Sequence, residues 1–236
     1  MLSYEEAVVA VTAPGQRFET ERITVGGVEL TAFTQVPRSL RELFETWRDR
    51  GDATFLVYED EQWSFAEVRR HADALAHALV HRYGVGPGDR VAIAMRNLPE
   101  WVVGFAAAMG AGAIAVSLNG WWTEDELDFA LEDSGTSVLL ADPERADRTR
   151  ATCARLGIAT VGVRGATGEG VDTYEAVVAL GEPLPDVDVA PDDDATILYT
   201  SGTTGRPKGA VSTHRAVIQA LAGFGCRTTG TRRRHR

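Results

Sequence analysis

The fold is decided by residues 91–163, where four short apolar runs alternate with three segments of helical length. The runs read VAIAM (91–95), AIAVS (113–117), VLLA (138–141) and ATVGV (159–163). The intervening segments are residues 99–109, 123–134 and 144–156. Alternation of this kind predicts βαβ units in a mostly parallel sheet. We therefore expect an α/β fold, with a parallel-rich sheet and flanking helices, whose ligand sites lie at the carboxyl ends of the strands.

The chain also divides by composition. Residues 1–182 are expected to form one α/β subdomain. Residues 183–194 contain three prolines and five aspartates, which is typical of a linker. A second α/β subdomain is expected to begin in residues 195–222, with residues 195–199 as its first strand. Residues 223–236 form an atypical basic tail that we expect to be disordered.

Local patterns predict several further elements. Residues 22–34 alternate around Gly26 and Gly27, which indicates a hairpin. Ser64 with Glu67, and Thr123 with Glu126, have the spacing of capping boxes at helix N-termini. Residues 101–123 carry no charge, but glycine and polar residues dilute them. A buried helix followed by a strand is therefore favoured over a membrane span.

Charge and cysteine content limit the partners and the compartment. The 236 residues carry a formal net charge of -10, so nucleic acid, which needs a basic surface, is not an expected partner. The two cysteines, Cys153 and Cys226, cannot build a disulfide scaffold and indicate a reducing compartment. No secretory signal opens the chain, so we expect a cytoplasmic location. No pattern indicates an oligomeric state.

The informative motif is ILYTSGTTGRPKG (197–209), a strand running into a loop of hydroxyls and glycines that ends at Lys208, the only lysine of the chain. Glycines let backbone N–H groups approach a ligand, and successive N–H groups form an anion site. A lysine ammonium suits phosphate. The order is not that of a Walker loop, because Pro207 precedes Lys208 and Gly209 follows it. The pattern predicts a phosphate cradle; a plain surface loop rich in Ser, Thr and Gly is the alternative.

At this motif the chain resembles the AMP-binding signature of the adenylate-forming superfamily, which includes acyl-CoA synthetases and peptide-synthetase adenylation domains. The match covers every position of the signature. Residues 63–67 are similar to the family's first core motif, and residues 110–119 to its second, although Ser117 stands where a proline is usual. Residues 121–123, 126–127 and 133–135 resemble acyl-CoA synthetases more closely than peptide synthetases.

The resemblance implies a two-step reaction. A carboxylic acid attacks ATP to give an acyl-adenylate and pyrophosphate, and coenzyme A then displaces AMP to form a thioester. By matching position, the residues that would bind the phosphates are Thr200, Ser201, Gly202, Thr203, Thr204, Gly205 and Lys208. Lys208, which would stabilise phosphate charge, and Thr200 are the candidate catalytic residues, and Thr200 is also the candidate ligand of Mg²⁺. The expected acid is a fatty acid or another hydrophobic acid.

The chain also departs from the family, whose members are longer. The family's downstream adenine and ribose motifs, its hinge and its C-terminal domain with the adenylation lysine have no counterpart here. The last ten residues hold five arginines and no acid. These features favour the interpretation that the chain is a truncated N-terminal portion of a longer protein. The alternative is that the last ten residues are a genuine basic tail that binds an acidic partner. The alternative function is an inactive fragment that binds nucleotide weakly or serves an interaction role. In a truncated chain, strand 195–199 is expected to lack neighbours and to exchange its amide hydrogens quickly.

The remaining side chains have more ordinary interpretations. His71, His77 and His81 share a predicted helix without a second cluster of ligands, which argues against a metal site. His214 is expected to cap the helix that follows it. Trp121 and Trp122 could contact an acyl substrate, but core packing is the favoured interpretation for both.

Overall fold

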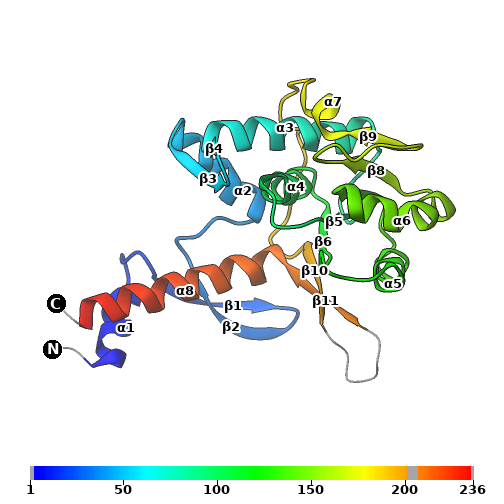
Figure 1. The fold of residues 1–236 in the computed structure, drawn as a ribbon. Helices are drawn as coiled ribbons and strands as arrows, with labels where there is room; N and C mark the ends of the chain where they lie inside the picture. Colours follow the sequence, from blue (N-terminus) through cyan, green and yellow to red (C-terminus); the bar gives the residue numbers. More distant parts are fainter. Residues whose placement is uncertain (1–2, 201–206, 235–236) are drawn as a thin grey trace.

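The computed structural model describes residues 3–200 and 207–234. Figure 1 shows helices on both sides of a central sheet, with a long C-terminal helix running away from it beside a separate hairpin. The predicted α/β class, with a parallel-rich sheet and flanking helices, is confirmed.

The central sheet has seven strands in the order β11-β10-β6-β5-β7-β8-β9. Every neighbouring pair is parallel except β10 and β11, which are antiparallel. The strands are β5 (Arg90–Ala94), β6 (Ile114–Ser117), β7 (Val138–Ala141), β8 (Ala159–Gly162), β9 (Val171–Thr173), β10 (Asp194–Thr200) and β11 (Lys208–Thr213). The four apolar runs are therefore neighbouring strands, as their alternation with helices predicts.

Two hydrophobic layers hold helices against the two faces of this sheet. On one face, Val91 and Ile93 of β5 pack with α3 (Phe65–His81) and α4 (Pro99–Gly110). On the other face, Ala92 of β5 and Leu139 of β7 pack with α5 (Glu124–Ser134) and α6 (Pro143–Leu156). Successive strand residues point to opposite faces, and both faces are covered, so these strands are apolar without alternation.

The capping patterns set two of the helix starts. The Ser64 hydroxyl accepts the N–H of Glu67, and the Glu67 carboxylate accepts the N–H of Ser64, at the start of α3. Thr123 and Glu126 form the same reciprocal pair at the start of α5. Both predicted capping boxes are confirmed.

The remaining elements frame the sheet. The predicted hairpin is present as β1 (Thr20–Val25) and β2 (Val28–Phe33), with positive φ at Gly26 and Gly27. A second hairpin joins β3 (Thr54–Tyr58) to β4 (Glu61–Ser64). The other helices are α1 (Tyr4–Thr12), α2 (Leu40–Glu45), a 3-10 helix at Thr46–Arg50, α7 (Tyr174–Val178) and α8 (His214–Arg234).

The C-terminal part of the chain differs from expectation in two ways. Strand β10 does not lack neighbours: it pairs with β6 on one side and β11 on the other, because its apolar residues Ala195 and Ile197 are buried with the main sheet. Residues 223–234, for which the sequence predicts disorder, continue α8, whose Cys226 packs on Val11 and Phe18, while residues 235 and 236 lie outside the described residues. The division of the chain into two subdomains stays a prediction.

Candidate functional site

A cavity of about 960 Å³ opens where the parallel strands end. Its walls come mainly from the segments at the ends of β5 and β6 and from Tyr199 and Pro207 of the β10–β11 hairpin, with further side chains from β3, α4 and α5 (Tyr58, Trp101 and Glu126). The strand order places these segments side by side, because β6 lies between β5 and β10. The cavity thus occupies the edge of the sheet at which ligand binding is expected.

The hairpin of β10 and β11 brings two of the predicted site residues together. Thr200 is the last residue of β10 and pairs in register with Lys208, the first residue of β11. The Thr200 hydroxyl donates to the Lys208 carbonyl at 3.5 Å, and both residues are exposed. The other predicted residues, Ser201, Gly202, Thr203, Thr204 and Gly205, lie outside the described residues. The structure therefore places Thr200 and Lys208 next to each other, each beside a residue of the cavity wall, Tyr199 and Pro207 respectively.

Tyr199 links this hairpin to α5 through hydrogen bonds of its side chain. Its hydroxyl contacts the Asp133 carboxylate at 2.7 Å and donates to the Ala130 carbonyl at 3.2 Å. Its ring meets the edge of Trp122, with ring centroids 5.9 Å apart. Burial and the Asp133 carboxylate raise the pKa of the Tyr199 hydroxyl above its usual range, so it stays protonated at neutral pH.

Two glycines allow close approaches at this edge. A Cβ atom on Gly209 would lie 2.9 Å from Cγ2 of Ile197 across the hairpin. A Cβ atom on Gly120 would lie 2.7 Å from the carbonyl oxygen of Met95. Side chains at these positions would push β11 from β10, or the turn after β6 from the end of β5.

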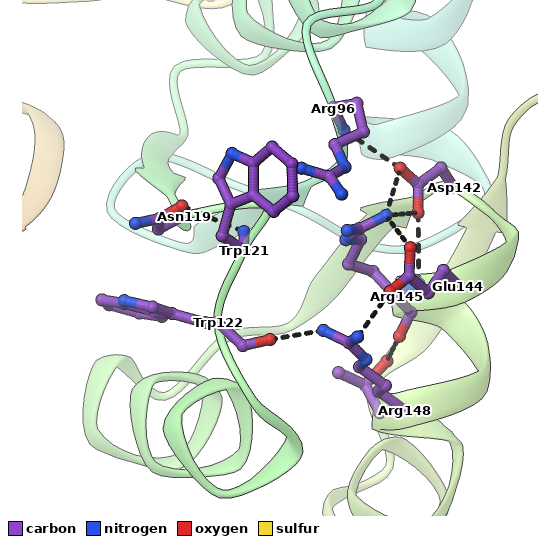
Figure 2. Close-up of polar contacts among 9 residues, drawn as sticks. Arg96, Asn119, Trp121, Trp122, Asp142, Glu144, Arg145 and Arg148 are labelled. Atoms are coloured by element: carbon purple, nitrogen blue, oxygen red, sulfur yellow. Dashed lines mark hydrogen bonds and ion pairs between the residues drawn. The ribbon is translucent and has the colours of Figure 1, made fainter.

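The prediction that Trp121 packs in the core is wrong. Its side chain is 77% exposed, and the Arg96 guanidinium carbon lies 3.1 Å from its ring centroid (Figure 2). Trp122, in contrast, is partly buried against the core, as expected. The sequence placed both on a loop after a strand, but their burial depends on how the neighbouring segment after β5 folds.

Arg96 is held in place by the next strand of the sheet. Its backbone N–H donates to Asp142 Oδ2 at 3.0 Å, and Asp142 directly follows β7. Asp142 also caps α6 by accepting the N–H of Arg145 at 3.1 Å. The sequence analysis did not identify Arg96 and Asp142 as residues near the site. Each of them directly follows a predicted strand, and a position at the carboxyl end of a parallel strand is itself a signal of a ligand site.

The histidines have structural contacts. His71 Nδ1 lies 2.8 Å from the Tyr174 hydroxyl. The rings of His77 and His81 are tilted by 46° to each other, with centroids 4.2 Å apart. His214 begins α8, and its Nδ1 accepts the N–H of Leu40 at 3.1 Å, so it joins α8 to α2. Burial lowers the pKa of both His71 and His214.

No group of three or more His, Cys, Asp or Glu side chains within residues 3–200 and 207–234 is arranged to hold a metal ion. Thr200 offers a single hydroxyl oxygen, which suits Mg²⁺ only as a partner of phosphate and water oxygens. In that same part of the chain no helix has the length and apolar character needed to cross a membrane.

Comparisons with known proteins agree with this architecture. Residues 43–235 match the family model described as AMP-binding enzyme. The chain is 36% identical over 162 residues to 4-coumarate–CoA ligase 3 of Oryza sativa subsp. japonica, covering 69% of this chain and 29% of that protein. It is 32% identical over 200 residues to a medium/long-chain-fatty-acid–CoA ligase of Mycobacterium tuberculosis, covering 83% and 33%.

A solved structure extends the likeness to three dimensions. The anthranilate CoA ligase AuaEII, in complex with anthranoyl-AMP, superposes with a TM-score of 0.69 at 25% identity, covering 75% of this chain and 35% of that one. The chain spans about 30% of the length of the two curated CoA ligases. The family match over residues 43–235, on an α/β sheet of this kind, places this chain in the AMP-binding enzyme family, whose curated members similar to it include acyl-CoA ligases.

Proposed function

We propose that the β10–β11 hairpin binds the phosphates of ATP and that the chain takes part in the ATP-dependent activation of a carboxylic acid. The observation that carries this proposal is the register of the hairpin, which sets Thr200 opposite Lys208, next in sequence to Tyr199 and Pro207 of the cavity wall. A hydroxyl and an ammonium at the two ends of a glycine-rich loop provide hydrogen bonds and positive charge to a polyphosphate.

The chemistry of such a site is electrostatic. Attack of a carboxylate on the α-phosphate releases pyrophosphate, and negative charge builds on the phosphate oxygens as the bond to pyrophosphate breaks. Lys208 would stabilise that charge, and Thr200 would orient an oxygen by a hydrogen bond. We include Ser201, Gly202, Thr203, Thr204 and Gly205 in the proposed phosphate site. Mg²⁺ would accompany ATP, held mainly by phosphate and water oxygens, with the Thr200 hydroxyl as the protein ligand.

The proposed product is an acyl-CoA thioester. Curated relatives are named as CoA ligases for coumarate and for medium- and long-chain fatty acids, so the relatives support coenzyme A as the acceptor. Met95, Leu118 and Trp101 line the cavity and favour an acid with a hydrophobic body. Aromatic and fatty acids both satisfy that description.

The test uses the 236-residue chain with Lys208→Ala, Lys208→Arg and a matched control, Arg22→Ala. Arg22 carries an equal charge on the β1–β2 hairpin, where it pairs with Glu29 at the surface. ATP affinity is measured by calorimetry, and pyrophosphate release is measured with coumarate and palmitate. Loss of a charge-assisted contact worth about 1.5–3 kcal/mol should weaken ATP binding about 10- to 150-fold in Lys208→Ala.

Lys208→Arg should retain part of that affinity, and Arg22→Ala should retain all of it. Equal ATP affinity in Lys208→Ala and the wild type would contradict the phosphate site. ATP binding with no pyrophosphate release would instead support the alternative function, a chain that binds nucleotide without turnover. Pyrophosphate release that depends on the acid supports the enzyme.

A further inference from the structure

Tyr199 directly precedes Thr200 in strand β10. Successive residues of a strand point to opposite faces, so Tyr199 and Thr200 use opposite faces of the β10–β11 hairpin. In the register of the hairpin, Tyr199 lies opposite Gly209, and Thr200 lies opposite Lys208. Residues that lie opposite each other in an antiparallel pair share a face. One face of the hairpin therefore carries Tyr199, and the other carries both candidate phosphate contacts.

The glycine at position 209 leaves room for the Tyr199 ring. A Cβ atom at Gly209 would lie 3.4 Å from Cζ of Tyr199 and 2.9 Å from Cγ2 of Ile197. A side chain there would displace the ring or separate the two strands. The ring thus lies close to the backbone of β11, one residue from Lys208.

The hydroxyl end of Tyr199 reaches the last turn of α5. It lies 2.7 Å from Asp133 Oδ2 and 3.2 Å from the Ala130 carbonyl oxygen. The Asp133 carboxylate is charged and closer, so it is the stronger acceptor. Trp122 meets the ring at an interplanar angle of 73°. These contacts fix the orientation of the Tyr199 side chain.

The end of α5 that carries Asp133 is itself held in place. Arg90, the first residue of β5, donates from Nε to the Ser134 carbonyl at 2.7 Å and from Nη2 to the Gly135 carbonyl. Leu131 is fully buried between α5 and the sheet. Asp133 is therefore a fixed point for the hairpin, and the hydrogen bond to Tyr199 connects the two.

The rest of this end of the hairpin has little burial. Strand β11 forms the edge of the sheet, and its first four residues, 208–211, are exposed. Leu198, which precedes Tyr199 on the other face of β10, is 52% exposed. Segments with few buried contacts open locally at a low cost in free energy. The position of Thr200 and Lys208 is therefore sensitive to the contacts of Tyr199.

We propose that Asp133 and Tyr199 are positioning residues of the phosphate site: their hydrogen bond holds the β10–β11 hairpin against α5 and prearranges Thr200 and Lys208 for a polyphosphate. The inference rests on the proposed function, because the polyphosphate is that of ATP. Tyr199 is also part of the cavity wall, whereas Asp133 belongs to α5 outside it. Prearrangement lowers the cost of ordering side chains on binding, so losing this hydrogen bond weakens ATP binding without removing a phosphate contact.

The test uses three variants of the full chain that change the Asp133–Tyr199 contact in different ways. Asp133→Ala removes the acceptor, Asp133→Asn keeps a neutral acceptor oxygen, and Tyr199→Phe removes the hydroxyl but keeps the ring. Asp125→Ala is the control, because Asp125 also lies on α5, is exposed and gives the same change of charge. Calorimetry measures the affinity for ATP, and hydrogen exchange measures the protection of residues 208–211.

Asp133→Ala and Tyr199→Phe should each weaken ATP binding about 3- to 10-fold, the equivalent of one net hydrogen bond, and should speed exchange over residues 208–211. Asp133→Asn should bind ATP at least twofold more tightly than Asp133→Ala. Both Asp133 variants remove the same charge, so their difference isolates the hydrogen bond from the repulsion between a carboxylate and ATP. Asp125→Ala should change the affinity less than twofold.

ATP affinities of Asp133→Ala and Tyr199→Phe within twofold of the wild type would overturn the inference, and so would equal losses in Asp133→Ala and Asp133→Asn. Lys208→Ala separates this inference from the proposed function. If Lys208→Ala weakens ATP binding and Tyr199→Phe does not, the phosphate site stands and the positioning role is refuted. If Lys208→Ala has no effect, or the wild type does not bind ATP, the phosphate site is refuted and the positioning role with it.

Discussion

Replacing His214 by alanine should detach the start of α8 from α2. His214 is fully buried, and its Nδ1 accepts the N–H of Leu40, a residue 174 positions earlier in the chain. Its own N–H donates to the Asp193 carbonyl at 3.0 Å. Because His214 directly follows β11, this contact also fixes the strand that carries Lys208.

The expected loss combines three effects. The Leu40 N–H would be left without an acceptor, which costs about 1–3 kcal/mol. Removing the imidazole leaves a void, and large-to-small core changes cost about 2–5 kcal/mol. The Nε2 atom is buried without a partner among the described residues, so its removal relieves part of this cost. We expect His214→Ala to lower the free energy of unfolding by about 2–4 kcal/mol, a typical value for a buried polar link.

Asparagine provides the decisive comparison. Its Oδ1 atom stands the same number of bonds from Cα as His214 Nδ1 and can accept the Leu40 N–H. His214→Asn should therefore recover about 1 kcal/mol or more of the loss. Urea unfolding measures both variants, and hydrogen exchange of the Leu40 amide reports the contact itself. Val211→Ala, on the preceding strand and 53% exposed, is the control and should change stability by less than about 0.5 kcal/mol. Equal losses in His214→Ala and His214→Asn, with unchanged exchange at Leu40, would refute the reasoning.

Other perturbations have equally definite outcomes. Leu140→Ala, in a fully buried position of β7, should lower the unfolding free energy in urea by about 2–5 kcal/mol, and a loss under 1 kcal/mol would contradict the packing. Gly120→Ala should destabilise the chain, because the new Cβ would lie 2.7 Å from the Met95 carbonyl oxygen, and an unchanged melting temperature would show that the turn can move. Burial lowers the pKa of His71 and His214 in the folded state, so the unfolded chain binds more protons as the pH falls through about 6.5. The melting temperature should therefore fall between pH 7.5 and pH 5.5, and the fall should be smaller in His71→Gln.

The elements that the sequence predicted best are those with a local physical cause. Capping depends on residues three positions apart, so Ser64 and Thr123 could be identified from the chain alone. The apolar runs of the central sheet were equally clear, because strands buried on both faces contain few polar residues. Short elements with half-buried residues, such as β9 (Val171–Thr173), gave no such signal.

The placement of β10 could not be predicted in the same way. Its pairing joins Thr196 to Ala115, and no local pattern states which distant strand will be a neighbour. The prolines and aspartates before it indicated a boundary, yet the segment leads the chain back to the same sheet, beside β6. Long-range pairing of this kind is decided by burial of the whole strand and not by its flanking composition.

The candidate site shows the same contrast. Lys208 stood out because its motif is continuous in sequence. Arg96 and Trp121 did not, because their relation arises from two separate strand ends that become neighbours only in the sheet. Trp121 contacts Arg96, and Asp142 fixes the Arg96 backbone, so the arrangement joins three separate strand ends that no single window of sequence contains.

The topology explains why the two ends of the candidate phosphate loop lie at the same edge of the sheet as the cavity. Strand β10 runs parallel to β6, so its last residue, Thr200, reaches the same edge as the ends of β5 and β7. Strand β11 then returns antiparallel, which keeps Lys208 at that edge instead of carrying it to the opposite end of the sheet. If β11 were joined to the sheet by a parallel crossover, its first residue would lie at the amino edge, far from the cavity. The antiparallel return is therefore the structural feature that keeps the Thr200 hydroxyl and the Lys208 ammonium at one edge of the sheet, as the proposed phosphate site requires.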